Sequence, residues 1–202
     1  MVGMWWPARV LVLSAVMVIP SLHAQVDHIL GEFIEQGRID SPSGRVIPYR
    51  IRLLPPASFP QLPPSVRQSL EDKECMIPQT YQAHTPENVV HGQFQRQGSS
   101  DWALLCSRNG STTLLIFLAG AAQPTEFVTH KDTDMSEVYD LTGVRGFAWG
   151  LDTAHPLEIN AHPENRHSGP YDHDGVIDTF LGHGGVIHYN KAGKWLSLEG
   201  TD

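Results

Sequence analysis

An Asn-Gly pair between two apolar runs is the feature that most restricts how this chain can fold. Residues 102–108 (WALLCSR) and residues 111–118 (STTLLIFL) meet across Asn109 and Gly110. Both central positions of a tight type I′ turn need a positive φ, so this pair predicts a two-residue β-hairpin. Counting outward from the turn gives the expected cross-strand pairs: Cys106 with Thr113, Leu104 with Leu115, and Trp102 with Phe117.

This predicted hairpin is apolar on both of its faces. Leu104 and Leu115 belong to one face, and Leu105 and Leu114 belong to the other. Such a strand pair has to be covered on both sides, so we expect it at the centre of an antiparallel sheet. Residues 89–95 are expected to add a neighbouring strand.

Weaker patterns predict the remaining elements. Apolar residues three and four positions apart indicate a short amphipathic helix over 27–35, and Pro64 near a first turn indicates a second helix over 64–74, with Val66 and Leu70 facing inward. The other expected elements are a strand at 46–53, a proline-rich extended connector at 55–64, weak strands and turns at 126–149, an irregular loop at 151–170, and a last hairpin at 186–198. The expected fold class is α+β: a single domain with a central antiparallel β-sheet and two short helices.

Residues 1–24 have the order of a secretory signal peptide. A lightly basic start with Arg9 leads into the apolar run 10–19, which Pro20 ends ahead of a small residue at Ala24. The apolar run is shorter than the roughly 20 residues that a membrane-spanning helix needs. We therefore expect cleavage, a mature domain at 25–202, a periplasmic or secreted location, and no stable membrane insertion afterwards. An uncleaved anchor is the alternative.

The chain has two cysteines, Cys75 and Cys106, and both belong to the mature part. An exported protein meets an oxidising compartment, so a disulfide between them is expected. It would join the end of the predicted second helix to the hairpin. Two buried free thiols are the alternative.

The charge of the chain narrows the class of partner. The net charge is −8, and it becomes −9 when Arg9 leaves with the signal peptide. An acidic surface disfavours nucleic acid and anionic lipid. An envelope protein or a small ligand remains as a possible partner, although solubility alone also explains an acidic surface.

Residues 172–178 (DHDGVID) are the first candidate site. Asp172, Asp174 and Asp178 surround a glycine that permits a tight turn, and calcium prefers oxygen ligands in such loops. His173 lies among them and could serve zinc. The alternative is that these residues only form a turn before an apolar strand.

The second candidate is a group of histidines in the region 155–188. Neutral imidazole binds zinc, copper or nickel, and a site needs three or four ligands. Exposed loop histidines are also common, so solvated side chains are the competing interpretation. The six histidines of this region are His155, His162, His167, His173, His183 and His188.

Two groups of segments resemble a group of uncharacterised exported bacterial proteins. One runs from CMIPQ at 75–79 through 88–94 to DWALLC at 101–106, and the other combines DHDGVID at 172–178 with 186–189 and 193–196. The resemblance implies a bacterial, signal-bearing, single-domain protein, and it carries no activity.

A shorter stretch, GQF at 92–94 followed by DWA at 101–103, is similar to one unit of the FG-GAP repeat. In that repeat an Asp-rich loop between strands binds calcium. Here QRQGSS stands at 95–100, so only 172–178 keeps an acidic pattern.

No nucleophile elbow, phosphate-binding loop, dinucleotide fingerprint or C-x-x-C motif is present in the sequence. We therefore expect a non-enzymatic exported domain that binds a ligand or a partner through the region 155–188, with Trp149 or Tyr171 in an exposed patch. The alternative is a metal-dependent hydrolase that uses the same region, with Glu158 or an aspartate beside His173 for acid–base work.

Overall fold

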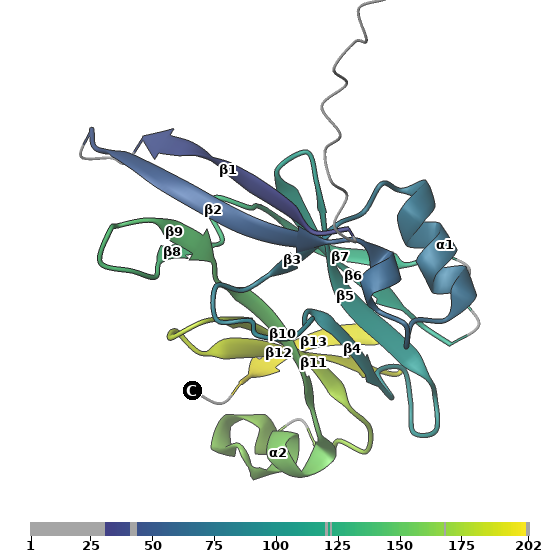
Figure 1. Ribbon diagram of the computed structural model, residues 1–202. Helices are drawn as coiled ribbons and strands as arrows, with labels where there is room; N and C mark the ends of the chain where they lie inside the picture. Colours follow the sequence, from purple (N-terminus) through teal and green to yellow (C-terminus); the bar gives the residue numbers. More distant parts are fainter. Residues whose placement is uncertain (1–30, 41–43, 120, 122, 168, 201–202) are drawn as a thin grey trace, which may run out of the picture.

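The computed structural model describes residues 31–40, 44–119, 121, 123–167 and 169–200. The predicted signal peptide and the expected cleavage point lie outside the described residues. Within the described part, most of the chain folds into three β-sheets, with two α-helices at their margins (Figure 1). The α+β expectation therefore holds in outline, but the expectation of a single central sheet is wrong.

Sheet B contains the predicted hairpin. It is an antiparallel meander of four strands, in the order β4 (Val89–Gly92), β5 (Asp101–Arg108), β6 (Ser111–Phe117) and β7 (Thr125–Lys131). Asn109 and Gly110 have φ values of 50° and 73°, as the predicted turn requires. The three predicted cross-strand pairs, from Cys106–Thr113 to Trp102–Phe117, are confirmed.

Two separate hydrophobic clusters cover the two faces of this hairpin, which confirms its expected central position. Leu104 and Leu115 belong to one cluster, which also contains Leu70 of the helix α1. Leu105 and Leu114 belong to the other, which also contains Trp149. Each face of the hairpin is thus removed from water by a different part of the chain.

Sheet A includes a long hairpin that extends beyond the rest of the molecule (Figure 1). Its strands are β1 (Phe33–Asp40), β2 (Val46–Leu54), β9 (Arg145–Phe147) and β8 (Ser136–Val138) in spatial order, with β3 (Ile77–Gln79) also paired to β2. The helix expected over 27–35 is wrong where it is described. Its last three residues, from Phe33 on, begin a strand that is the antiparallel partner of β2, because pairing across eight positions outweighs a weak helical pattern.

Sheet C lies at the C-terminal side of the chain. It is a second four-stranded meander, formed by β10 (Trp149–Ala154), β11 (Gly175–Phe180), β12 (Gly185–Lys191) and β13 (Lys194–Glu199). The last predicted hairpin is confirmed as β12 and β13. The irregular loop expected at 151–170 is wrong, because this segment contains most of β10, the helix α2 (Pro156–Ala161) and a 3-10 helix at Pro163–His167.

The helix α1 (Pro64–Asp72) confirms the second predicted helix, and its Val66 and Leu70 are buried as expected. The proline-rich connector before it contains a 3-10 helix at Pro56–Ser58. Cys75, just after α1, forms a disulfide with Cys106 on β5, with the two Cα atoms 5.3 Å apart. Among the described residues, no helix has both the length and the apolar character that a membrane crossing requires.

Asn88 joins the three sheets through its polar groups. Its side-chain amide donates to the carbonyl of Pro78 in β3 at 2.8 Å and to that of Trp149 in β10 at 3.2 Å. Its side-chain oxygen accepts from the backbone N–H of Leu151 at 2.9 Å, and its backbone carbonyl accepts from Leu105 in β5 at 3.1 Å. The residue is 2% exposed, so these contacts are shielded from water.

We expect the variant Asn88→Ala to lower the free energy of unfolding by on the order of 3–5 kcal/mol. The change removes three side-chain hydrogen bonds, to the backbone of Pro78, Trp149 and Leu151, at about 1–3 kcal/mol for each group left unpaired. It also places alanine at a φ of 66°, a backbone conformation that asparagine adopts more readily. Chemical denaturation followed by circular dichroism measures the change.

Asn109→Ala is the matched control. Asn109 is an exposed asparagine that also has a positive φ. Its replacement therefore removes the preference of asparagine for a positive φ without removing bonds between sheets. We expect a loss of about 1 kcal/mol. Equal losses in the two variants would contradict the role assigned to Asn88.

Removal of the disulfide is expected to lower the free energy of unfolding by roughly 3–4 kcal/mol, because the bond closes a loop with a sequence separation of 31. The double variant Cys75→Ala/Cys106→Ala tests this by denaturation. Mass spectrometry without reductant provides the check on the wild-type chain, since two free thiols there would contradict the bond.

Candidate functional site

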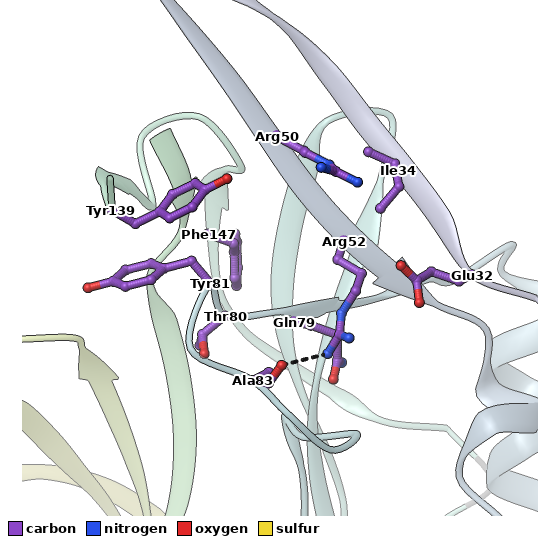
Figure 2. A pocket seen from close by; sticks show the side chains of 10 residues that line it. All are labelled: Glu32, Ile34, Arg50, Arg52, Gln79, Thr80, Tyr81, Ala83, Tyr139 and Phe147. Atoms are coloured by element: carbon purple, nitrogen blue, oxygen red, sulfur yellow. Dashed lines mark hydrogen bonds between the residues drawn. The ribbon is translucent and has the colours of Figure 1, made fainter. Parts of the chain in front are cut away.

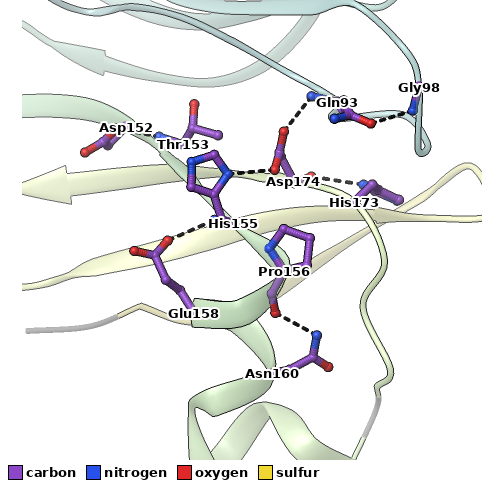
Figure 3. A network of polar contacts seen from close by, with 10 residues as sticks. All are labelled: Gln93, Gly98, Asp152, Thr153, His155, Pro156, Glu158, Asn160, His173 and Asp174. Atoms are coloured by element: carbon purple, nitrogen blue, oxygen red, sulfur yellow. Dashed lines mark hydrogen bonds and ion pairs between the residues drawn. The ribbon is translucent and has the colours of Figure 1, made fainter.

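The His- and Asp-rich region at 155–188 packs around sheet C, and its clearest contact joins His155 to Asp174 (Figure 3). His155 Nδ1 lies 2.9 Å from Asp174 Oδ1, and Asp174 Oδ2 accepts from the backbone N–H of Gln93 at 2.9 Å. The carboxylate side chain is 10% exposed, whereas the imidazole is 67% exposed. The hydrogen bond to Asp174 raises the pKa of His155, and partial burial opposes this shift.

His155 also fixes the start of the helix α2. Its backbone N–H donates to Glu158 Oε2 at 2.9 Å, which completes a capping arrangement at the first turn. Glu158 therefore caps a helix, and Figure 3 shows its carboxylate directed to the backbone of His155. Asp174 and Glu158 together hold this histidine at the junction of β10, α2 and the loop before β11.

The carboxylates of Asp178 and Asp172, two other predicted metal ligands, bond to side chains of the protein. Asp178 Oδ1 accepts from the indole N–H of Trp149, and its Oδ2 lies 3.2 Å from His188 Nε2. Asp172 Oδ1 accepts from the Tyr189 hydroxyl at 3.1 Å. These carboxylates thus fix an indole, an imidazole and a phenol, each at a separate point of sheet C.

His173 is buried and faces backbone on both sides of its ring. Nδ1 lies 3.0 Å from the carbonyl oxygen of Asp174, and Nε2 lies 2.8 Å from that of Asn190. The ring also stacks on Tyr189, with centroids 4.2 Å apart. Within the described part of the chain, no group of three or more His, Cys, Asp or Glu side chains is arranged to hold a metal ion. Calcium or zinc at Asp172, His173, Asp174 and Asp178 stays a prediction without geometric support.

The exposed aromatic patch expected at Trp149 or Tyr171 is wrong. Trp149 is fully buried in the cluster that covers one face of the β5–β6 hairpin. Tyr171 is 3% exposed and packs edge-on against Tyr189, with ring centroids 4.7 Å apart. Large aromatic side chains near a polar loop are drawn into the core because their burial removes so much apolar surface from water.

A second polar cluster surrounds the buried carboxylate of Asp132, just after β7. Its two oxygens accept from the hydroxyls of Ser107 at 2.5 Å and Thr112 at 2.6 Å, and its backbone N–H donates to Gly110. Burial raises the pKa of Asp132, and the two hydroxyls oppose the shift. Burial, followed by the charge of Asp132, also raises the pKa of the nearby Glu35. Both Asp132 oxygens are occupied, so this cluster closes the turns of sheet B.

The third candidate is a pocket beside β2, and it begins with the alternation of that strand. Ile51 and Leu53 are buried on one face of β2. Because successive side chains of a strand alternate in direction, Arg50 and Arg52 lie on the opposite face. The register places Arg52 directly across from Ile34 in β1. One face of the hairpin therefore carries two arginines at successive positions.

These arginines form one wall of a cavity of about 220 Å³ (Figure 2). Arg52 donates to the carbonyl oxygen of Ala83 at 3.2 Å, which holds its guanidinium at the rim. Arg50 is exposed, and its side chain has no hydrogen-bond or ion-pair partner among the described residues. The complete lining is Glu32, Ile34, Arg50, Arg52, Gln79, Thr80, Tyr81, Ala83, Tyr139 and Phe147. We call this cavity the Arg–Tyr pocket.

Two stacked tyrosines form the opposite wall. The rings of Tyr81 and Tyr139 are nearly parallel, at 17°, with centroids 5.4 Å apart. Gly146 in β9 makes this stack possible, because a Cβ there would lie 2.6 Å from Cβ of Tyr81 and 2.9 Å from the ring of Tyr139. The backbone N–H of Tyr81 donates to the carbonyl of Phe147 at 2.8 Å, which fixes the loop after β3 against β9.

The chemistry of this arrangement suits an anion with a planar or apolar part. A guanidinium matches a carboxylate with two parallel N–H donors, and aromatic walls accept flat groups. Glu32 is the one carboxylate in the described lining, and it is exposed. The pocket is thus a positive site on an acidic chain.

Sequence reasoning missed this pocket, although a signal for half of it was present. The run YRIRL at 49–53 alternates arginine with apolar residues, which predicts two arginines on one face of a strand. No local pattern places Tyr81 and Tyr139 together, because they are far apart in the chain and meet only when β9 joins sheet A.

Comparison of the chain with protein-family models, with curated proteins and with solved structures finds no match. The resemblances to exported bacterial proteins and to FG-GAP units stay predictions. The geometry of the Arg–Tyr pocket and of the His155–Asp174 pair is therefore what bears on function.

We expect Asp174→Asn to lower the pKa of His155 toward its ordinary value of 6.5. Because the folded-state pKa is raised, the contact stabilises the fold fully below about pH 6.5, and this contribution is lost as pH rises through the folded-state pKa. A ¹H–¹⁵N NMR titration of the imidazole measures the shift. Glu71→Gln, an exposed acid in α1, should leave it unchanged, and an unaltered His155 titration in Asp174→Asn would contradict the role of the carboxylate.

Proposed function

We propose that this chain is an exported, non-enzymatic domain, working in the periplasm or outside the cell, that binds a carboxylate-bearing ligand in the Arg–Tyr pocket. The observation that carries the proposal is the pairing of Arg50 and Arg52 on one wall with the Tyr81–Tyr139 stack on the other. The signal-like residues 1–24 and the Cys75–Cys106 disulfide support an oxidising location.

The lining of the pocket favours binding over catalysis. Its described residues include no histidine or cysteine, and Glu32 has no imidazole or hydroxyl bonded to it there. A base and a nucleophile within hydrogen-bond reach are what a hydrolytic site needs. The alternative, a metal-dependent hydrolase at 155–188, needs three converging ligands, and the described part of the chain offers no such group.

The full chain is expected to bind N-acetyl-phenylalanine, which has one carboxylate and one ring, and to ignore the neutral N-acetyl-phenylalanine amide. The reason is that only the carboxylate can accept charge-assisted hydrogen bonds from the arginines. NMR chemical-shift titration gives the affinity and locates the perturbed residues. Equal binding of the acid and the amide, or chemical-shift changes at residues outside the pocket, would contradict the proposal.

Arg50→Gln and Arg52→Gln should each weaken binding of the acid about ten-fold, since a hydrogen bond to a charged group contributes roughly 1.5–3 kcal/mol. Arg108→Gln is the matched control: it removes an exposed arginine at the end of β5, outside this pocket. Isothermal titration or NMR measures the three affinities. A loss in the control as large as in the pocket variants would mean that the effect is only one of overall charge.

A further inference from the structure

A third arginine continues the line that Arg50 and Arg52 begin. In the β1–β2 register Arg52 pairs with Ile34, Arg50 with Gln36, and the next pair on the same face is Pro48 with Arg38. Directly opposed side chains in an antiparallel pair share a face of the sheet. Arg52, Arg50 and Arg38 therefore follow one another along one face of the hairpin, and we call them the arginine row.

A second hollow of about 320 Å³ extends the Arg–Tyr pocket along this row. Arg50 lines both hollows, so the two adjoin at its side chain. The second hollow is lined by Gln36, Gly37, Arg38, Pro48, Tyr49, Arg50 and Val144. A ligand that fills both hollows has to be longer than a single carboxylate group.

The charges along this face form a pattern. Among the described residues, the side chains of Arg38 and Arg50 have no hydrogen-bond or ion-pair partner, and the side chain of Arg52 bonds only to a backbone carbonyl. Glu32 lies at one end of the row and Asp40 at the other. Both are an even number of positions from Arg38, and alternate residues of a strand share a face. A positive centre between negative ends repels a long uniform polyanion and suits a short acidic stretch.

We propose that the ligand is an acidic peptide segment that lies extended along the arginine row, with carboxylate side chains at every second residue. The inference rests on the proposed function and names its ligand class. An extended chain rises about 3.3 Å per residue, so alternate side chains of such a peptide repeat at the same interval as Arg50 and Arg52 on β2. Pro48 and Val144 line the second hollow and offer apolar contact to the aliphatic stems of those acids.

Two synthetic peptides of identical composition test the spacing. One has three glutamates at alternate positions with threonine between them. Its isomer has the three glutamates in a row. Fluorescence anisotropy at low salt, with the full chain, is expected to show several-fold tighter binding of the alternating peptide, and binding that weakens as salt is added. Equal affinities for the two isomers would overturn the inference.

Arg38→Gln separates this inference from the proposed function. It should weaken the alternating peptide roughly two- to five-fold, as expected for an exposed ion pair, while leaving N-acetyl-phenylalanine unaffected, because Arg38 lies outside the Arg–Tyr pocket. Arg108→Gln should change neither, and circular dichroism confirms the fold of each variant.

Each remaining outcome has one meaning. If the small acid binds through Arg50 while Arg38→Gln leaves the peptide affinity unchanged, the peptide inference is wrong and the proposed function stands. If an oligogalacturonate binds as tightly as the alternating peptide, the ligand class is a polysaccharide and the inference is overturned. If neither the acid nor the peptide binds, the proposed function itself is wrong.

Discussion

The arrangement of the three sheets depends on the buried side chain of Asn88. One carboxamide bonds to β3 of sheet A and to β10 of sheet C, while the backbone carbonyl of the same residue bonds to β5 of sheet B. Its φ of 66° turns the chain into β4 at this point. Asparagine suits the position because it tolerates a positive φ and offers both donors and an acceptor. The bonds of Asn88 thus fix sheets A, B and C relative to one another.

Acidic side chains in this protein mostly serve the fold. Asp101 is fully buried and accepts from the backbone N–H groups of Gln95 and Ala119, which fixes the loop before β5. Asp174 likewise accepts from the backbone N–H of Gln93, and Asp132 accepts from the hydroxyls of Ser107 and Thr112. A buried carboxylate is stable only when its oxygens are bonded, so carboxylates that fix loops have few lone pairs left for a cation. This is the physical reason why an Asp-rich sequence pattern here did not lead to a group of converging ligands in the described residues.

The positive site has the opposite character: among the described residues the Arg50 side chain has no hydrogen-bond or ion-pair partner, and the Arg52 side chain bonds only to the carbonyl oxygen of Ala83. Arg50 faces a cavity beside stacked tyrosines in a chain whose net charge is −8. Local structure contributes one wall, because β2 alternates arginine with buried apolar residues. Tertiary structure contributes the other wall, because the parallel contact of β2 with β9, at Tyr49 and Arg145, brings the loop that carries Tyr139 across from β2. The proposed recognition of a carboxylate thus depends on sheet A as a whole.

From the sequence alone, the elements with local signals could be predicted: the β5–β6 hairpin with its register, the helix α1 and the last hairpin. The disulfide could also be predicted, because the chain has only two cysteines. Turn chemistry and side-chain periodicity act at that range. Only the tertiary structure decided that Phe33–Asp40 is a strand, that Asp174 serves His155, and that Arg50 faces Tyr81 and Tyr139. Those outcomes depend on partners up to 89 positions away. The packing of whole sheets selects such partners, because no local backbone preference distinguishes one distant partner from another.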